Sequence, residues 1–121
     1  MKKILIIEDE STLLATLGYL LLYAGYQVVS AIDGVDGLEK VQQEKPDLIL
    51  CDVMMPKLNG YNFLKQHCLS SYSHIPVVLM SAKSDLEDEL QGLALGAKAY
   101  IRKPFRFEHL ETIIKKYLLT T

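Results

Sequence analysis

The sequence predicts an α/β fold, a doubly wound parallel sheet of five strands with five helices packed on its two faces. Short aliphatic and β-branched runs alternate with longer segments of helical periodicity. Most of the short runs are apolar at consecutive positions, as in parallel strands that helices cover on both faces. The length of 121 residues, half of them apolar, suits a single domain over residues 1–121.

The five strands and the first helix can be placed in order along the chain. The strands are expected at residues 4–7, 28–31, 48–51, 77–80 and 99–102. The first helix should bury one apolar stripe and end at Gly25, because glycine readily takes the left-handed conformation of a helix cap. Its stripe consists of Leu13, Leu17, Leu20, Leu21 and Ala24.

Turn-forming residues place the second and third helices. The second helix should begin at Asp33-Gly34 and stop before Pro46, because proline cannot continue a helix. The third helix should open at Gly60 and run to about Leu69.

Two signals place the last helices. Ser84 and Glu87 have the spacing of a capping box, which predicts the start of a fourth helix that ends at Gly96. The fifth helix is expected over residues 107–118, where apolar positions again recur at helical spacing.

Composition argues against nucleic acid and membrane as partners. The 13 basic and 15 acidic residues leave a formal charge of -2 without long runs of one sign. Residues 11–30 carry no charge, but Gly25 and Gln27 divide them into a helix and a strand, so no membrane insertion is expected. Two cysteines cannot form a disulfide framework, which favours a cytoplasmic location.

Acidic residues stand where two of the expected strands end. Glu8 and Asp9 follow the first strand, and Asp52 follows the third. If these strands are neighbours, three carboxylates meet at the carboxyl edge of the sheet, where such folds bind ligands. Crowded carboxylates raise one another's pKa unless a cation holds them ionised. Hard oxygen ligands suit Mg²⁺, and a carboxylate beside a metal can attack phosphorus to form an aspartyl phosphate.

Two further strand ends add a hydroxyl and an ammonium to the same edge. Ser81 closes the fourth strand, and Lys103 follows the fifth. Taken singly, Ser81 is equally typical of a turn cap, and Lys103 of a surface lysine. Taken with the carboxylates, they complete the set that stabilises a transferring phosphoryl group: a metal, a cation and a hydroxyl donor. The combination therefore predicts a phosphoryl-transfer site.

With these residues in place, the chain resembles a response-regulator receiver domain of two-component signalling over essentially its whole length. The motifs stand in that family's order: Glu8-Asp9, Asp52 within D-V-M-M-P, Lys57-Leu58-Asn59-Gly60, Ser81-Ala82 and Lys103-Pro104-Phe105. The resemblance implies a flavodoxin-like fold with strand order 2-1-3-4-5. It also implies a signalling domain and not an enzyme with a separate substrate. Such a domain catalyses only its own phosphorylation and dephosphorylation.

The resemblance also assigns roles to the site residues. Asp52 would accept a phosphoryl group from a histidine kinase or a histidine phosphotransfer protein. Glu8 and Asp9 would hold Mg²⁺ together with Asp52 and the backbone carbonyl of Met54. Ser81 and Lys103 would contact the phosphoryl oxygens, and the Lys103-Pro104 peptide bond would be cis.

The resemblance further implies how the signal leaves the domain. Tyr100 matches the family's switch aromatic, which rotates inward when Ser81 moves toward the phosphoryl group. The surface formed by the fourth helix, the fifth strand and the fifth helix would then change and meet a downstream protein whose identity the sequence does not give. The dimer that many relatives form through this surface is in doubt, because Lys98 and Ala99 depart from their pattern. Other phosphorylation-dependent dimers remain open.

The outer face of the first helix carries Ala15, Tyr19, Leu22 and Tyr23 where charges are usual. An apolar outer face favours a binding site, so we hypothesise that it docks the helical bundle of the phosphoryl donor; an ordinary helix flank is the alternative.

Three alternatives to a phosphorylatable receiver fit the sequence less well. A haloacid-dehalogenase-like phosphatase needs an acid two residues after its nucleophile, where this chain has Met54. A flavodoxin-like cofactor module needs a phosphate-binding loop after the first strand, where Glu8 and its acidic neighbours would repel phosphate. A degenerate receiver that docks without phosphorylation is disfavoured because no key position is missing. The three histidines show no metal-ligand spacing.

Overall fold

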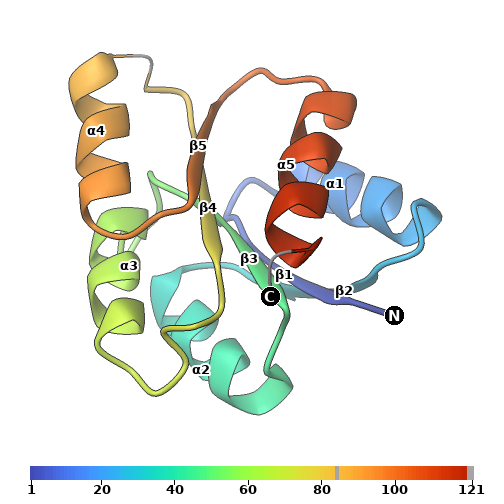
Figure 1. Cartoon of the computed structure of the whole chain (residues 1–121), viewed down its shortest axis with the longest axis horizontal. Coiled ribbons are helices and arrows are strands. Elements are labelled where there is room, and N and C mark those ends of the chain that lie inside the picture. The colour runs from blue at the N-terminus through green and yellow to red at the C-terminus, as the bar shows by residue number, and fades with distance from the viewer. Residues whose placement is uncertain (84, 120–121) are drawn as a thin grey trace.

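The structure, a computed structural model, describes residues 1–83 and 85–119 and contains one parallel sheet in the order β2-β1-β3-β4-β5 (Figure 1). The strands are β1 (Lys3–Ile7), β2 (Gln27–Ala31), β3 (Leu48–Asp52), β4 (Val77–Ser81) and β5 (Ala99–Arg102). Each neighbouring pair is parallel. The predicted fold class and strand order are confirmed, and the strand ends differ from the expected ones by at most one residue.

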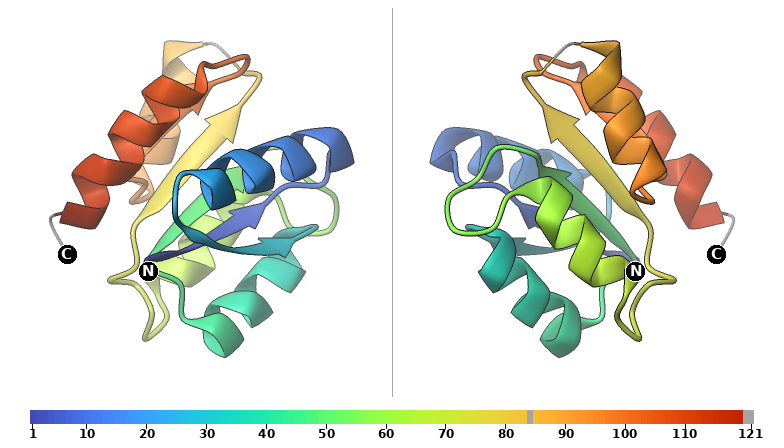
Figure 2. Two further views of the ribbon diagram at one scale, coloured as in Figure 1. Left: turned by 90° about the vertical axis from the view of Figure 1, so that its right-hand side faces the viewer. Right: turned by 90° about the vertical axis from the view of Figure 1, so that its left-hand side faces the viewer.

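Five helices cover the sheet, two on one face and three on the other, as the views in Figure 2 show. They are α1 (Ser11–Tyr23), α2 (Gly34–Glu44), α3 (Gly60–Cys68), α4 (Leu86–Ala94) and α5 (Phe107–Leu119). Helices α1 and α5 share one hydrophobic cluster, while α2 and α3 contribute to the other, against which α4 also lies. No helix in the described part of the chain is long and apolar enough to span a membrane.

Consecutive strand residues point to opposite faces of the sheet, and both faces are buried. In β1, Ile4 and Ile6 pack toward α1 and α5, whereas Leu5 and Ile7 pack toward α2 and α3. All four side chains are fully buried. Two-sided burial explains why the strands read as continuous apolar runs rather than as an alternating pattern.

Short polar residues begin the second and third helices as expected. The Asp33 side chain accepts a hydrogen bond from the Asp36 backbone N–H, and Asn59 does the same for Asn62. Such capping satisfies N–H groups that have no partner within the helix. Gly25 has a left-handed backbone after α1, so that predicted helix end is confirmed.

Two details of the predicted helices were wrong. The fourth helix has Asp85, not Ser84, at its N-cap, and the Asp85 side chain makes no capping hydrogen bond. Ser84 itself lies outside the described residues. Acidic side chains in the first turn of α4 still favour this end, because they oppose the positive pole of the helix dipole. Ala24 is exposed rather than part of the buried stripe, since it stands at the C-cap, past the last turn of α1.

Candidate phosphoryl-transfer site

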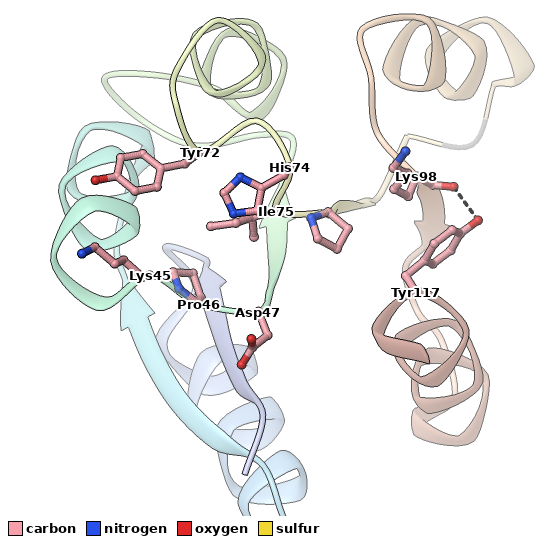
Figure 3. A pocket seen from close by; sticks show the side chains of 9 residues that line it. Lys45, Pro46, Asp47, Tyr72, His74, Ile75, Lys98 and Tyr117 are labelled. Atoms are coloured by element: carbon pink, nitrogen blue, oxygen red, sulfur yellow. Dashed lines mark hydrogen bonds between the residues drawn. The ribbon is translucent and has the colours of Figure 1, made fainter. Parts of the chain in front are cut away.

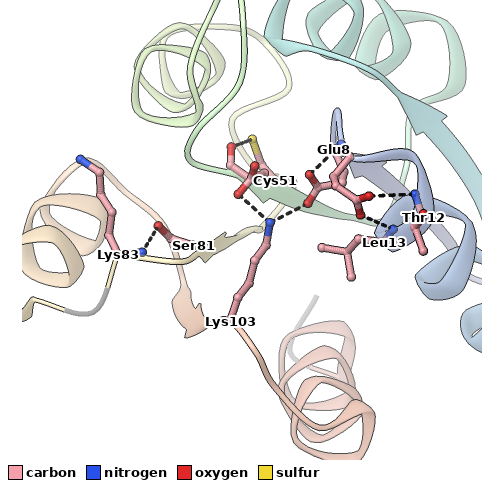
Figure 4. A network of polar contacts seen from close by, with 9 residues as sticks. Glu8, Thr12, Leu13, Cys51, Ser81, Lys83 and Lys103 are labelled. Carbon is pink, nitrogen blue, oxygen red and sulfur yellow. Dashed lines mark hydrogen bonds and ion pairs between the residues drawn. The ribbon is translucent and has the colours of Figure 1, made fainter.

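The strand register brings the predicted groups to one edge of the sheet. β1 and β3 are neighbours, and Ile7 pairs with Cys51, so Glu8 and Asp52 come next on adjacent strands. Likewise Ser81 pairs with Arg102, which places Ser81 beside Lys103. The carboxyl ends of β1, β3, β4 and β5 thus present two acids, a hydroxyl and an ammonium together (Figure 4).

Lys103 joins the two buried carboxylates of the site. Its Nζ donates hydrogen bonds to Glu8 Oε1 at 2.9 Å and to Asp52 Oδ1 at 3.1 Å. Glu8 is 1% exposed and Asp52 is 5% exposed. The Lys103 backbone N–H donates to the Ser81 carbonyl, and the Lys103-Pro104 bond is cis, as the resemblance implied. The ammonium therefore lies between two acids that water barely reaches.

Burial sets the protonation behaviour of these groups. It raises the pKa of Glu8 and of Asp52 above their ordinary values, and the Lys103 hydrogen bonds oppose the rise only in part. Burial lowers the pKa of Lys103, but its hydrogen bonds to Glu8 and Asp52 outweigh this, so the pKa ends above its ordinary value. The lysine stays charged, and a further cation would favour two ionised acids.

The acidic groups fit a divalent metal. One carboxylate oxygen from each of Glu8, Asp9 and Asp52 lies within 4.8 Å of the other two. Asp9 is exposed, so one side of this group opens to water. Mg²⁺ prefers a site with a small number of protein oxygen ligands and with access to water. The Met54 carbonyl was predicted as a further ligand and stays a prediction.

Glu10, which belongs to the same acidic run, has a different task. Its carboxylate accepts hydrogen bonds from the backbone N–H groups of Thr12 and Leu13 and so caps α1. The Glu10 N–H donates in turn to Glu8 Oε2 at 3.1 Å. The cap therefore fixes the loop that carries Glu8. Glutamate is less common than serine or aspartate at this position, so the sequence did not predict this role.

Ser81 and Tyr100 both bind Lys83 in this structure. Ser81 is fully buried, and its Oγ accepts a hydrogen bond from the Lys83 N–H at 2.9 Å. The Tyr100 hydroxyl donates to the Lys83 carbonyl at 3.1 Å. Accepting a bond leaves the Ser81 proton available to another acceptor. Lys83 thus links the predicted hydroxyl donor to the predicted switch aromatic.

Gly60 holds the loop after Asp52 close to the sheet. Its N–H donates to the Val53 carbonyl at 2.8 Å. A Cβ at this position would overlap the Asp52 carbonyl oxygen and lie 2.8 Å from Val53 Cα. The close approach requires glycine, which explains why the residue that opens α3 also matters to the site.

Two hollows of about 570 Å³ flank the sheet at different edges. One lies at the amino ends of the strands, far from Glu8, Asp9 and Asp52, and is lined by Lys45, Pro46, Asp47, Tyr72, His74, Ile75, Pro76, Lys98 and Tyr117 (Figure 3). The other is a largely apolar groove between α1 and the segment after β5, with Lys103 in its wall. Only the second adjoins the phosphoryl-transfer site.

The fold and the site together define the class of protein. Residues 4–115 match the family model of the response regulator receiver domain. The match covers most of the chain, so the chain belongs to this family. It is a signalling domain homologous to two-component response regulators.

Named relatives and solved structures agree with this assignment. The chain is 42% identical to the probable transcriptional regulator ycf27 of Cyanophora paradoxa, over 99% of this chain and 49% of that protein. It is 36% identical to protein PilG of Pseudomonas aeruginosa, over 96% of this chain and 87% of that protein. The structure of Vibrio cholerae chemotaxis protein CheY4 matches with a TM-score of 0.90 and 31% identity, covering 97% of this chain and 98% of that one. The chain spans about half the length of the ycf27 relatives that it matches.

Proposed function

We propose that Asp52 accepts a phosphoryl group from the phosphohistidine of a histidine kinase or a histidine phosphotransfer protein. This proposal rests on the Lys103 ammonium, which donates hydrogen bonds to Asp52 and Glu8. At the same edge of the sheet, Asp9 joins these two acids in a group of three carboxylates that could hold a metal ion. A carboxylate oxygen of Asp52 attacks phosphorus, an O–P bond forms, and the imidazole nitrogen leaves with the electron pair of the broken P–N bond. Water later cleaves the O–P bond and releases inorganic phosphate.

Each residue of the site would have its own role in phosphoryl transfer. Glu8 and Asp9 would hold Mg²⁺ with Asp52 and the Met54 carbonyl, and the ion when bound supplies positive charge to the phosphoryl oxygens. Lys103 can turn from the Asp52 carboxylate to a phosphoryl oxygen without leaving Glu8. Ser81 can donate its hydroxyl proton to another phosphoryl oxygen. These contacts stabilise charge that spreads over the oxygens during transfer.

The domain acts on itself and not on a separate substrate. A phosphatase of the haloacid-dehalogenase type would need an acid where Met54 stands, and the Met54 side chain is exposed. A cofactor phosphate would meet Glu8 and Asp9 at the end of β1, where the charge is negative. Both alternatives therefore fit the site worse than phosphorylation of Asp52. A cytoplasmic location stays a prediction from composition.

The groove beside Lys103 offers a place for the phosphoryl donor. Leu13, Leu20 and Phe107 lie in its walls, so a donor helix bound there would approach the site along α1. The outer face of α1 is also apolar and exposed, with Tyr19 74% exposed and Leu22 58% exposed. This exposure supports the hypothesis that α1 docks the helical bundle of the donor.

Tyr100 is the proposed switch. Its hydroxyl holds the Lys83 carbonyl, and the Lys83 N–H holds Ser81. Recruitment of Ser81 to a phosphoryl oxygen would strain this link, release Tyr100 and change the surface of α4, β5 and α5. The changed surface would then bind a downstream protein, or a second copy of the domain in a phosphorylation-dependent dimer.

The direct test is intact mass after incubation with acetyl phosphate, with and without Mg²⁺, for the wild type and Asp52→Asn. A gain of one phosphoryl group that needs both Mg²⁺ and Asp52 supports the proposal. A wild type that gains none would favour the alternative, a degenerate receiver that docks without phosphorylation.

A further inference from the structure

Tyr61 connects the loop after Asp52 to the start of α4. It follows Gly60, the residue packed on the Asp52 backbone, and its side chain is buried. Its hydroxyl donates a hydrogen bond of 3.1 Å to the Asp88 carbonyl, in the first turn of α4. The Asp88 side chain also forms an ion pair with Lys83, with 3.8 Å between Oδ1 and Nζ. Tyr61 therefore touches α4 near the residue that binds Ser81 and Tyr100.

The rings of Tyr61 and Tyr100 meet across a glycine of α4. A Cβ on Gly92 would lie 3.3 Å from Tyr100 Cδ2 and 3.6 Å from Tyr61 Cε1. It would also approach Leu79 Cδ1 to 2.7 Å, so the helix, the sheet and both rings fill this space completely. In a packed space of this kind, movement of the Tyr100 ring changes its packing against both Tyr61 and α4.

Each of the two tyrosine hydroxyls donates a hydrogen bond to a backbone carbonyl at or just before the start of α4. Tyr100 holds the Lys83 carbonyl before the helix, and Tyr61 holds the Asp88 carbonyl within its first turn. Burial, and after it the neighbouring Tyr100, raises the pKa of Tyr61 to about 12. The Tyr61 hydroxyl therefore remains a protonated donor at neutral pH.

We propose that Tyr61 is a positioning residue that fixes the resting place of α4 and yields when Tyr100 turns inward on phosphorylation of Asp52. This inference rests on the proposed function. The partner of this buried hydroxyl is a helix carbonyl at the output surface, a contact that a phenylalanine ring in the same space could not make. Contiguous contacts of this sort, each with two arrangements, can couple a site to a distant surface.

The first test measures hydrogen exchange without a phosphodonor in the wild type, Tyr61→Phe and Tyr117→Phe. Tyr117 is a matched control because its hydroxyl also donates to a backbone carbonyl, that of Lys98, at 2.9 Å. Tyr61→Phe should speed exchange in the first turn of α4 by about fivefold, the effect expected for one lost neutral hydrogen bond. Tyr117→Phe should leave that turn unchanged. Equal exchange in wild type and Tyr61→Phe, or an equal acceleration throughout β3, would overturn the inference.

The second test measures the affinity for fluoroberyllate with Mg²⁺, a phosphoryl mimic that binds an aspartate carboxylate. If Tyr61 stabilises the resting state, Tyr61→Phe should bind the mimic about fivefold more tightly, by reciprocal coupling. The Tyr117→Phe control should match the wild type. Binding by the wild type with no change in Tyr61→Phe would refute the role of Tyr61 alone. No binding by the wild type would refute the proposed function and this inference with it.

Discussion

Lys103 donates a hydrogen bond of 3.1 Å to Asp52 although 51 positions separate them in the chain. β5 and β3 lie on either side of β4 in the sheet, so the long lysine side chain reaches across one strand. This distance gives Asp52 a fixed positive neighbour in a buried place, and Glu8 holds that neighbour from its other side.

Lys103→Gln should slow phosphorylation of Asp52 by roughly a hundredfold at saturating Mg²⁺, because a charge aimed at the phosphoryl oxygens is lost. The rate is read from intact mass during incubation with acetyl phosphate. Lys98→Gln removes a charge at the opposite edge of the sheet and should keep the wild-type rate. A Lys103→Gln variant as fast as Lys98→Gln would show that the ammonium has no part in transfer.

Asp9→Asn should weaken Mg²⁺ binding by at least about tenfold, because a neutral amide replaces one of few charged ligands. Calorimetric titration with MgCl₂ measures the affinity directly. Asp85→Asn serves as the control, since Asp85 is acidic and exposed but lies outside the group of three acids. Equal affinities for the two variants would place the metal elsewhere.

Gly60→Ala should destabilise the fold by about 1–3 kcal/mol, because the added methyl group must displace backbone at Asp52 or Val53. Gly18→Ala is the matched control with the opposite sign. A Cβ on Gly18 meets only Val28 Cγ1 at 3.8 Å, so alanine there should stabilise α1 by about 0.5–1 kcal/mol. Urea unfolding of both variants checks the pair, and a Gly60→Ala protein as stable as the wild type would contradict the close contact.

His67 should make stability depend on pH. Its side chain is buried, stacks on Phe63 and lies 2.9 Å from the Ile75 carbonyl through Nε2. Burial lowers the pKa of His67 below 6.5, so near that pH the unfolded chain binds more protons than the folded one. Stability present above pH 6.5 is therefore lost as pH falls toward the folded-state pKa, with a slope of at most about 1.4 kcal/mol per pH unit.

Urea unfolding between pH 7.5 and 5.5 measures this slope. His67→Gln should be less dependent on pH than the wild type, whereas His109→Gln, which changes an exposed histidine, should keep the wild-type slope. If the His67→Gln and wild-type slopes agree, the buried imidazole does not control the acid sensitivity.

The sequence predicted the site well because parallel strands place their carboxyl ends at one edge. Glu8, Asp52, Ser81 and Lys103 all stand at strand ends, so the strand order alone brings them together. Sequence periodicity could not reveal the hydroxyl of Tyr61 on the Asp88 carbonyl, because that bond depends on how α3 and α4 pack. His67 shows no metal-ligand spacing in the sequence, but its spacing of four residues from Phe63 places it on the buried side of α3.

Reduction with borohydride identifies the phosphorylated residue directly. Borohydride reduces an aspartyl phosphate to homoserine, and peptide mass spectrometry then locates the converted residue. After incubation with acetyl phosphate and Mg²⁺, homoserine is expected at position 52 and at no other acid, and none is expected when Mg²⁺ is omitted. Homoserine at position 9, or an unchanged peptide around Asp52 in a protein that has gained a phosphoryl group, would contradict it.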